Sequence, residues 1–169
     1  GSLPAPPLNR ACRPAGVTLQ PMSPAWQEAQ ERPLPNGAKN GLLLSIVPAA
    51  PAVADSALVM RLRQAGCVVI GKTNTPEFGA GANTRNAVYG ATGNPFDPVK
   101  SCAGSSGGSA VALATGMAPI CSGSDTGGSL RNPAAFCGIV GYRPTPGLVA
   151  NEKRAHGWSN LPVLGPMAR

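Results

Sequence analysis

Two glycine-serine clusters, separated by a short Ala-rich segment, constrain the fold of this chain more than any other feature. The first, AGSSGGS at 103–109, runs directly into AVALATGM, whose Ala and Leu residues favour a helix. The second, SDTGGS at 124–129, follows the apolar run APIC at 118–121. Glycine adopts backbone angles that other residues avoid. Each cluster is therefore predicted to be a polar loop that leads into a helix or a turn.

Free backbone N–H groups in such a loop suit the chemistry of acyl transfer. Addition to a carbonyl builds negative charge on its oxygen, and a preorganised amide that donates to this oxygen contributes about 3 to 4 kcal/mol. The candidate donors are the amides of Thr126, Gly127, Gly128 and Ser129. A serine hydroxyl also needs a base that takes its proton. The pattern predicts a serine-nucleophile site for amide or ester hydrolysis.

The same residues carry a resemblance to a known family. GSSGGS at 104–109 and SDTGGSLRNPAAFCGIVGYRPTPG at 124–147 resemble the amidase signature family, whose hydrolases use a Ser-Ser-Lys triad. The resemblance covers roughly residues 51–169, which makes it far more specific than one short motif. It implies an α/β fold with an incomplete amidase-signature core, in which a mixed β-sheet is flanked by helices.

The resemblance also implies roles for individual residues. Ser129 corresponds to the nucleophile, and Ser105 corresponds to the serine that relays the proton, which in the family follows a cis peptide bond. The range 126–129 falls on the oxyanion-hole positions. Asp125 and Arg131 fall on flanking polar positions that give structural support.

The third member of the triad is a lysine, which the family supplies from a buried strand with the pattern Gly-x-Pro-x-x-x-Lys-Asp. That pattern is absent here. Lys39 is the only lysine upstream of Lys72, and it is followed by Asn40, not by Asp. The base is therefore not identified, and Lys39 is the remaining candidate. Lys72 falls on the family's Gly-Lys-Thr-Asn segment, which is separate from the catalytic lysine, and we interpret it as a solvated loop residue.

Two other site types fit the sequence less well. A triad of Ser129, His156 and Asp125 would place a neutral-pH titrating group at the site. Asp125 lies only four residues before Ser129, however, and His156 follows a Lys-Arg pair that indicates exposure, so a surface histidine is favoured. The first cluster also lacks the Gly-x-x-x-x-Gly-Lys-Ser/Thr spacing of a phosphate-binding loop.

The chain divides into two parts by composition. Residues 1–50 form a Pro-rich segment with no sustained hydrophobic period and a poor match to the family, and we expect them to be irregular. For residues 51–169, the resemblance implies a partial amidase signature domain. Within it, ADSALVMRLRQAG at 54–66 predicts an amphipathic helix with Asp55 as N-cap and Gly66 as its stop. CVVIGKTN at 67–74 predicts a buried strand.

Composition excludes several classes of function. The net charge of +7 is scattered along the chain and only 4% of residues are aromatic, which indicates a solvated basic surface and no nucleic-acid partner. The five cysteines are odd in number and include no Cys-x-x-Cys pair, so neither a disulfide framework nor a metal site is indicated. No apolar run is long enough to cross a membrane and no signal peptide is recognisable, so a cytoplasmic location is expected.

Three functional hypotheses follow. The first is an amide hydrolase that acts on a small-molecule amide through an acyl-enzyme and needs no cofactor. The second is a truncated, catalytically inactive chain that lacks the catalytic lysine. The third is the amidase-type subunit of a tRNA-dependent amidotransferase. In addition, unpaired sheet edges are expected to favour oligomers or other association.

Overall fold

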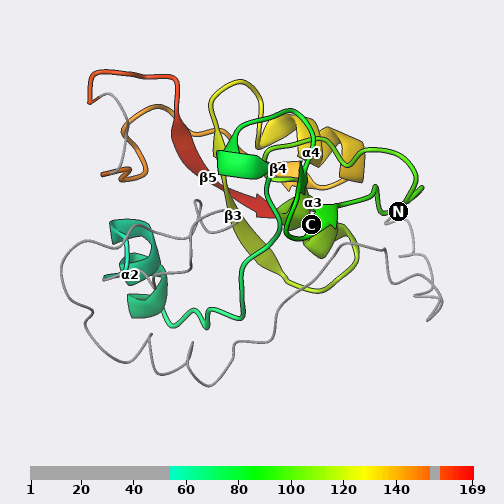
Figure 1. The fold of residues 1–169 in the computed structure, drawn as a ribbon. Helices are drawn as coiled ribbons and strands as arrows, with labels where there is room; N and C mark the ends of the chain where they lie inside the picture. Colours follow the sequence, from blue (N-terminus) through cyan, green and yellow to red (C-terminus); the bar gives the residue numbers. More distant parts are fainter. Residues whose placement is uncertain (1–53, 153–156) are drawn as a thin grey trace, which may run out of the picture.

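The computed structural model describes residues 54–152 and 157–169, and the predictions for residues 1–50, for Lys39 and for His156 lie outside this part of the chain. The expected α/β class is confirmed. In chain order the elements are α2 (Ala57–Gln64), the short helix η1 (Glu77–Gly79), β1 (Arg85–Asn86), β2 (Gly90–Ala91), α3 (Gly107–Ala114), β3 (Ile120–Asp125), α4 (Arg131–Cys137), β4 (Val140–Gly141) and β5 (Val163–Ala168) (Figure 1).

Strand β5 is the centre of a three-stranded sheet with the order β3-β5-β4. It pairs with β3 in an antiparallel register from Ile120↔Ala168 to Asp125↔Val163. It also pairs antiparallel with β4, while β1 and β2 form a separate antiparallel pair. Val163, Gly165 and Met167 of β5 are buried and alternate with less buried residues, so one face of β5 is directed inward. Helices α3 and α4 pack together against this sheet (Figure 1).

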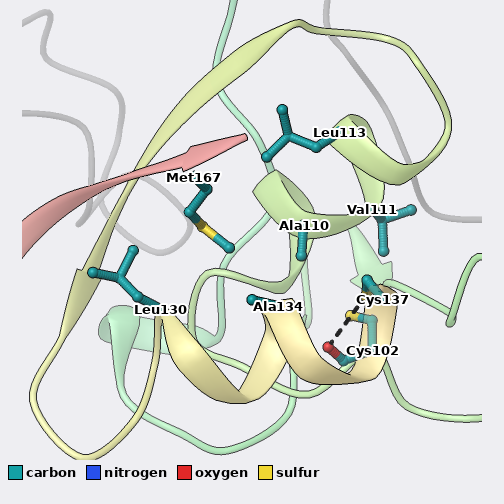
Figure 2. Close-up of a cluster of buried hydrophobic side chains, with 8 residues drawn as sticks. All are labelled: Cys102, Ala110, Val111, Leu113, Leu130, Ala134, Cys137 and Met167. Atoms are coloured by element: carbon teal, nitrogen blue, oxygen red, sulfur yellow. Dashed lines mark hydrogen bonds between the residues drawn. The ribbon is translucent and has the colours of Figure 1, made fainter. Parts of the chain in front are cut away.

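The hydrophobic core lies between α3, α4 and β5, directly behind both glycine-serine clusters. Figure 2 shows Met167 of β5, Ala134 of α4 and Leu130, which precedes α4, directed toward the residues of α3. Full burial of a side chain as large as Leu or Met contributes roughly 1.5–3 kcal/mol. The buried members of the cluster are Cys102, Ala110, Val111, Leu113, Leu130, Ala134, Cys137 and Met167. This core fixes α3 and α4, and with them the loops that enter both helices.

Two thiols of the core are expected to resist alkylation in the native protein. Cys102 and Cys137 are 0% exposed, and the Cys137 thiol donates to the Cys102 carbonyl at 3.8 Å (Figure 2). Burial, together with the neighbouring Cys102, raises the pKa of Cys137 to about 12. Because the thiolate is the reactive form, iodoacetamide at pH 8 should modify exposed Cys67 but not Cys102 or Cys137. Peptide mass mapping checks this, and native modification of Cys137 as fast as Cys67 would contradict the packing.

Helix α2 begins one residue later than the sequence predicted. Asp55 was expected as N-cap, but the cap is Ser56, whose hydroxyl accepts a hydrogen bond from the Val59 amide at 3.3 Å. The N-cap oxygen must reach an amide in the first turn, and Ser56 stands directly before the first helical residue. Asp55 instead pairs with Arg63 at 3.3 Å. The predicted end of the helix at Gly66 agrees with the structure, where this glycine has φ +85°.

The buried strand predicted at 67–74 is wrong, because this segment forms no strand. Val68 is 83% exposed and Ile70 is 51% exposed. An apolar segment becomes a buried strand only where another strand accepts its backbone hydrogen bonds, and no strand of the described residues pairs with it. The polar end of the segment at 67–74 is held by a side-chain hydrogen bond instead, in which the hydroxyls of Thr73 and Ser109 lie 2.8 Å apart.

Candidate active site

The first glycine-serine cluster is wrapped around the buried side chain of Thr84. The Thr84 hydroxyl donates to the Ala103 carbonyl at 2.9 Å and accepts from the Gly107 amide at 3.1 Å. A Cβ at Gly107 would collide with this hydroxyl, so glycine is required there. A cis peptide bond joins Gly104 to Ser105, at the position that the family resemblance implied. Thr84 therefore sets the course of the loop that carries Ser105.

Replacement of Thr84 with valine tests this arrangement. Valine keeps the shape of threonine but leaves the Gly107 amide without its buried acceptor, which costs about 1–3 kcal/mol. We expect a loss of this size in the free energy of unfolding, measured by urea denaturation. Thr145→Val is the matched control, because Thr145 is exposed. Equal midpoints for the two variants would show that Thr84 does not hold the loop.

Ser106 joins the first cluster to the second. Its amide donates to the Ser129 carbonyl at 3.3 Å. Its hydroxyl donates to the Ser124 carbonyl and accepts from the Ser124 amide, both at 3.2 Å. Ser105, the preceding residue, is only 6% exposed, whereas Ser129 is half-buried. The two serines singled out from the sequence thus lie on loops that are directly hydrogen-bonded to each other.

Asp125 organises the second cluster from within. Its fully buried carboxylate accepts hydrogen bonds from the amides of Gly128 and Leu130 at 2.9 and 3.0 Å. Arg131 donates to both carboxylate oxygens, and Arg143 donates to one of them, each at 3.0 Å. Burial alone would raise the pKa of Asp125, but the hydrogen bonds from Arg131 and from these two amides hold it well below its ordinary value. The carboxylate therefore stays ionised and closes the turn.

Gly128 differs from the other three candidate oxyanion donors. Its N–H is already donated to Asp125, so it is committed to the turn. The amides of Thr126, Gly127 and Ser129 have no hydrogen-bond acceptor among the described residues. Nothing lies within 4 Å of a Cβ built at Gly127, so the turn is open on this side. Of the four amides of this turn, only that of Gly128 therefore has an acceptor among the described residues.

Arg143 was not singled out by the sequence reasoning, although it completes the Asp125 cluster. It also donates to the Asp125 backbone carbonyl and, at 2.8 Å, to the Leu161 carbonyl. Its carboxylate partner lies 18 residues away along the chain, so no local spacing points to the contact. The only available signal was its place in the GYRPTPG stretch that carries the family resemblance.

The lysine of the predicted triad is not found at the described site. Lys39 lies outside the described residues. Lys72 is exposed, although partial loss of hydration lowers the pKa of its ammonium group. In the described part of the chain, no group of acidic, cysteine or histidine side chains could hold a metal ion, and no helix there is long and apolar enough to cross a membrane.

Comparisons with known proteins agree on one family. Residues 44–169 match the family model described as Amidase. A glutamyl-tRNA(Gln) amidotransferase subunit of Alkaliphilus metalliredigens is 51% identical over 115 residues, which are 68% of this chain and 23% of that protein. The corresponding subunit of Thermus thermophilus is 49% identical over 138 residues, which are 82% of this chain and 28% of that protein. The chain thus spans about a quarter of the length of these curated relatives.

Solved structures give the same picture. The corresponding glutamyl-tRNA(Gln) amidotransferase subunit from Thermotoga maritima matches with a TM-score of 0.66 and 38% identity over 80% of this chain and 30% of that one. A 6-aminohexanoate cyclic dimer hydrolase, solved with its substrate, matches with a TM-score of 0.64 and 40% identity over 68% of this chain and 24% of that one.

Proposed function

The chain belongs to the amidase family, and on this premise we propose that its two glycine-serine clusters form an acyl-transfer site for amides. The observation that carries the proposal is the turn closed by Asp125. This turn leaves the amides of Thr126, Gly127 and Ser129 without acceptors among the described residues and is bonded to the Ser105 loop through Ser106. Such amides suit a developing oxyanion, because they are fixed before the reaction begins.

The proposed reaction proceeds in two stages. The Ser129 hydroxyl attacks the amide carbonyl, and the three amides stabilise the negative charge that forms on the carbonyl oxygen. Ser105 relays the proton of Ser129 toward the leaving nitrogen, so that an amine departs and an acyl ester remains on Ser129. Water then hydrolyses this ester and restores the serine. A lysine serves as the ultimate base in this scheme, and we assign it to no described residue.

The surroundings of the two serines support their different roles. Ser105 is 6% exposed, and its hydroxyl has no hydrogen bond within the described residues, so it is free to bond with a reacting group. Ser129 is half-buried and stands beside the open Gly127. A nucleophile needs this access to substrate, whereas a proton relay needs only to lie within hydrogen-bond reach of the group whose proton it passes on. Asp125 and Arg131 act in this scheme through the shape of the turn.

Labelling with a fluorophosphonate probe tests the proposal. The probe reacts with activated serines, and mass mapping of the wild-type protein should locate one label on Ser129. Unactivated serines should remain unmodified under the same conditions. The absence of any label on folded protein would favour the catalytically inactive partial chain.

A second candidate function rests on the curated relatives at 49–51% identity, which are subunits of glutamyl-tRNA(Gln) amidotransferases. In this reading the chain is the amidase-type subunit, glutamine is its substrate and other subunits are its partners. The outer edges of β3 and β4, which pair with no strand of the described residues, could support such association. Glutamine hydrolysis that appears only with co-purifying subunits would favour this function over a free amidase.

We place the activity in the cytoplasm on the strength of the sequence. Its odd number of cysteines and its lack of Cys-x-x-Cys pairs fit a reducing compartment. The cysteines of the described residues, Cys67, Cys102, Cys121 and Cys137, are all free thiols.

A further inference from the structure

Arg131 uses only one edge of its guanidinium group inside the protein. Its Nε and Nη2 atoms donate to the two carboxylate oxygens of Asp125, each at 3.0 Å. Its Nη1 atom has no partner among the described residues, and the side chain is 54% exposed. Arg143 is different, because it donates to Asp125 and to the Leu161 carbonyl and its side chain is only 22% exposed. Of the two arginines on Asp125, Arg131 alone presents a largely open edge.

The charges at this turn do not balance. Two guanidinium groups contact one carboxylate, so one positive charge is left over. Two further ion pairs, Asp55–Arg63 and Lys100–Asp97, are made in other parts of the chain. Of the two guanidinium groups, that of Arg131 is the more exposed to solvent, because the Arg143 side chain is largely covered. Arg131 lies only two positions after Ser129.

Resting on the proposed function, we propose that the open edge of Arg131 binds a carboxylate of the amide substrate, so that the site prefers amides that also carry an acid group. A planar guanidinium matches a carboxylate through two parallel hydrogen bonds, which is stronger than a contact with a neutral group. Asp125 holds the inner edge and thereby fixes the direction of the outer edge. Arg131 is in this view a specificity-determining residue as well as a support of the turn.

Pairs of substrates that differ only in the carboxylate test whether the site recognises this charge. Succinamate and glutaramate are compared with butanamide and pentanamide, in which a methyl group replaces the carboxylate. For the wild-type chain we expect kcat/KM to be roughly tenfold or more higher for the acidic member of each pair. Where turnover is slow, the protection of Ser129 from the fluorophosphonate probe by each compound gives the same comparison.

Two variants separate recognition of the substrate carboxylate from structural support of the turn. Arg131→Gln and Arg143→Gln each remove one positive charge and one partner of Asp125. In Arg131→Gln, the ratio of kcat/KM for the acidic amide to kcat/KM for its neutral partner should fall to within about twofold of one. In Arg143→Gln this ratio should be retained, even if both values of kcat/KM fall. A purely structural role for Arg131 would lower kcat/KM for both members of a pair equally and leave their ratio unchanged.

The outcomes distinguish this inference from the function on which it rests. Labelling of Ser129 without a preference for acidic amides in the wild type would overturn the inference and leave the acyl-transfer site standing. An equal loss of preference in both variants would also overturn it, because the general charge of the turn would then be responsible. If folded protein shows no label on Ser129, the proposed function and the inference fall together.

Discussion

Replacement of Ser129 with alanine is expected to abolish fluorophosphonate labelling and to lower amide hydrolysis by roughly 10⁴-fold to 10⁶-fold. The reason is that the acyl group has no oxygen to bond to once this hydroxyl is gone. The turn itself should survive, because it is held by Asp125 and by the Ser129 carbonyl, neither of which the substitution removes. The free energy of unfolding should therefore change little. Labelling stoichiometry and initial rates measure the effect.

Ser122→Ala is the matched control for this experiment. Ser122 lies on β3, seven positions before Ser129, and is exposed; its backbone carbonyl accepts a bond from Ser109, which alanine preserves. This variant should label and hydrolyse as the wild type does. If Ser129→Ala still takes up the label at another serine, the nucleophile lies elsewhere and the proposed site is wrong.

Replacement of Asp125 with asparagine is expected to destabilise the chain by about 3–5 kcal/mol. The ion pair of Asp125 with Arg143 is mostly covered, and removing one partner from a buried ion pair usually costs this much. The variant leaves Arg131 and Arg143 without their counter-charge, and an amide oxygen cannot replace both oxygens that accept from Gly128 and Leu130. Urea denaturation measures the loss. Activity should fall with it, because the amides at 126–129 lose their anchor.

The same carboxylate predicts the response of stability to acid. The folded pKa of Asp125 lies below its unfolded value, which is about 3.9 for a free aspartate. The ionised Asp125 therefore contributes its full share to the free energy of unfolding when the pH is well above the unfolded pKa. This share is lost progressively as the pH falls through the unfolded pKa toward the folded pKa. The free energy of unfolding of the wild type should decrease between about pH 5 and pH 3. In Asp125→Asn this component of the decrease should be missing.

Asp97→Asn is the control variant for both the urea denaturation and the pH dependence of the free energy of unfolding. Asp97 pairs with Lys100 at 3.1 Å on the surface, where both side chains are well exposed. Exposed pairs of this kind contribute about 0–1 kcal/mol. A variant that loses as much stability as Asp125→Asn would show that burial is not what makes Asp125 important.

Local features of the site could be predicted from the sequence. Glycines and a following Ala-rich run indicated the loop and helix at 103–114, and the family resemblance implied the cis bond before Ser105. Contacts between distant residues could not be predicted this way. The pairing of Arg143 with Asp125 has no local spacing, and the bond that takes the Gly128 amide away from a ligand depends on how the turn closes. The failed strand at 67–74 has the same cause, since a strand is defined by its neighbour.

Ser106 holds the two glycine-serine clusters together, and this has a consequence for engineering. For the loops that carry Ser105 and Ser129 to drift apart, the bonds of Ser106 to Ser124 and to the Ser129 carbonyl would have to break together. The pair should consequently behave as one rigid body under heating or mutation of the periphery. Helix α2 buries none of its residues, so substitutions on its surface should leave the spacing of these two loops unchanged.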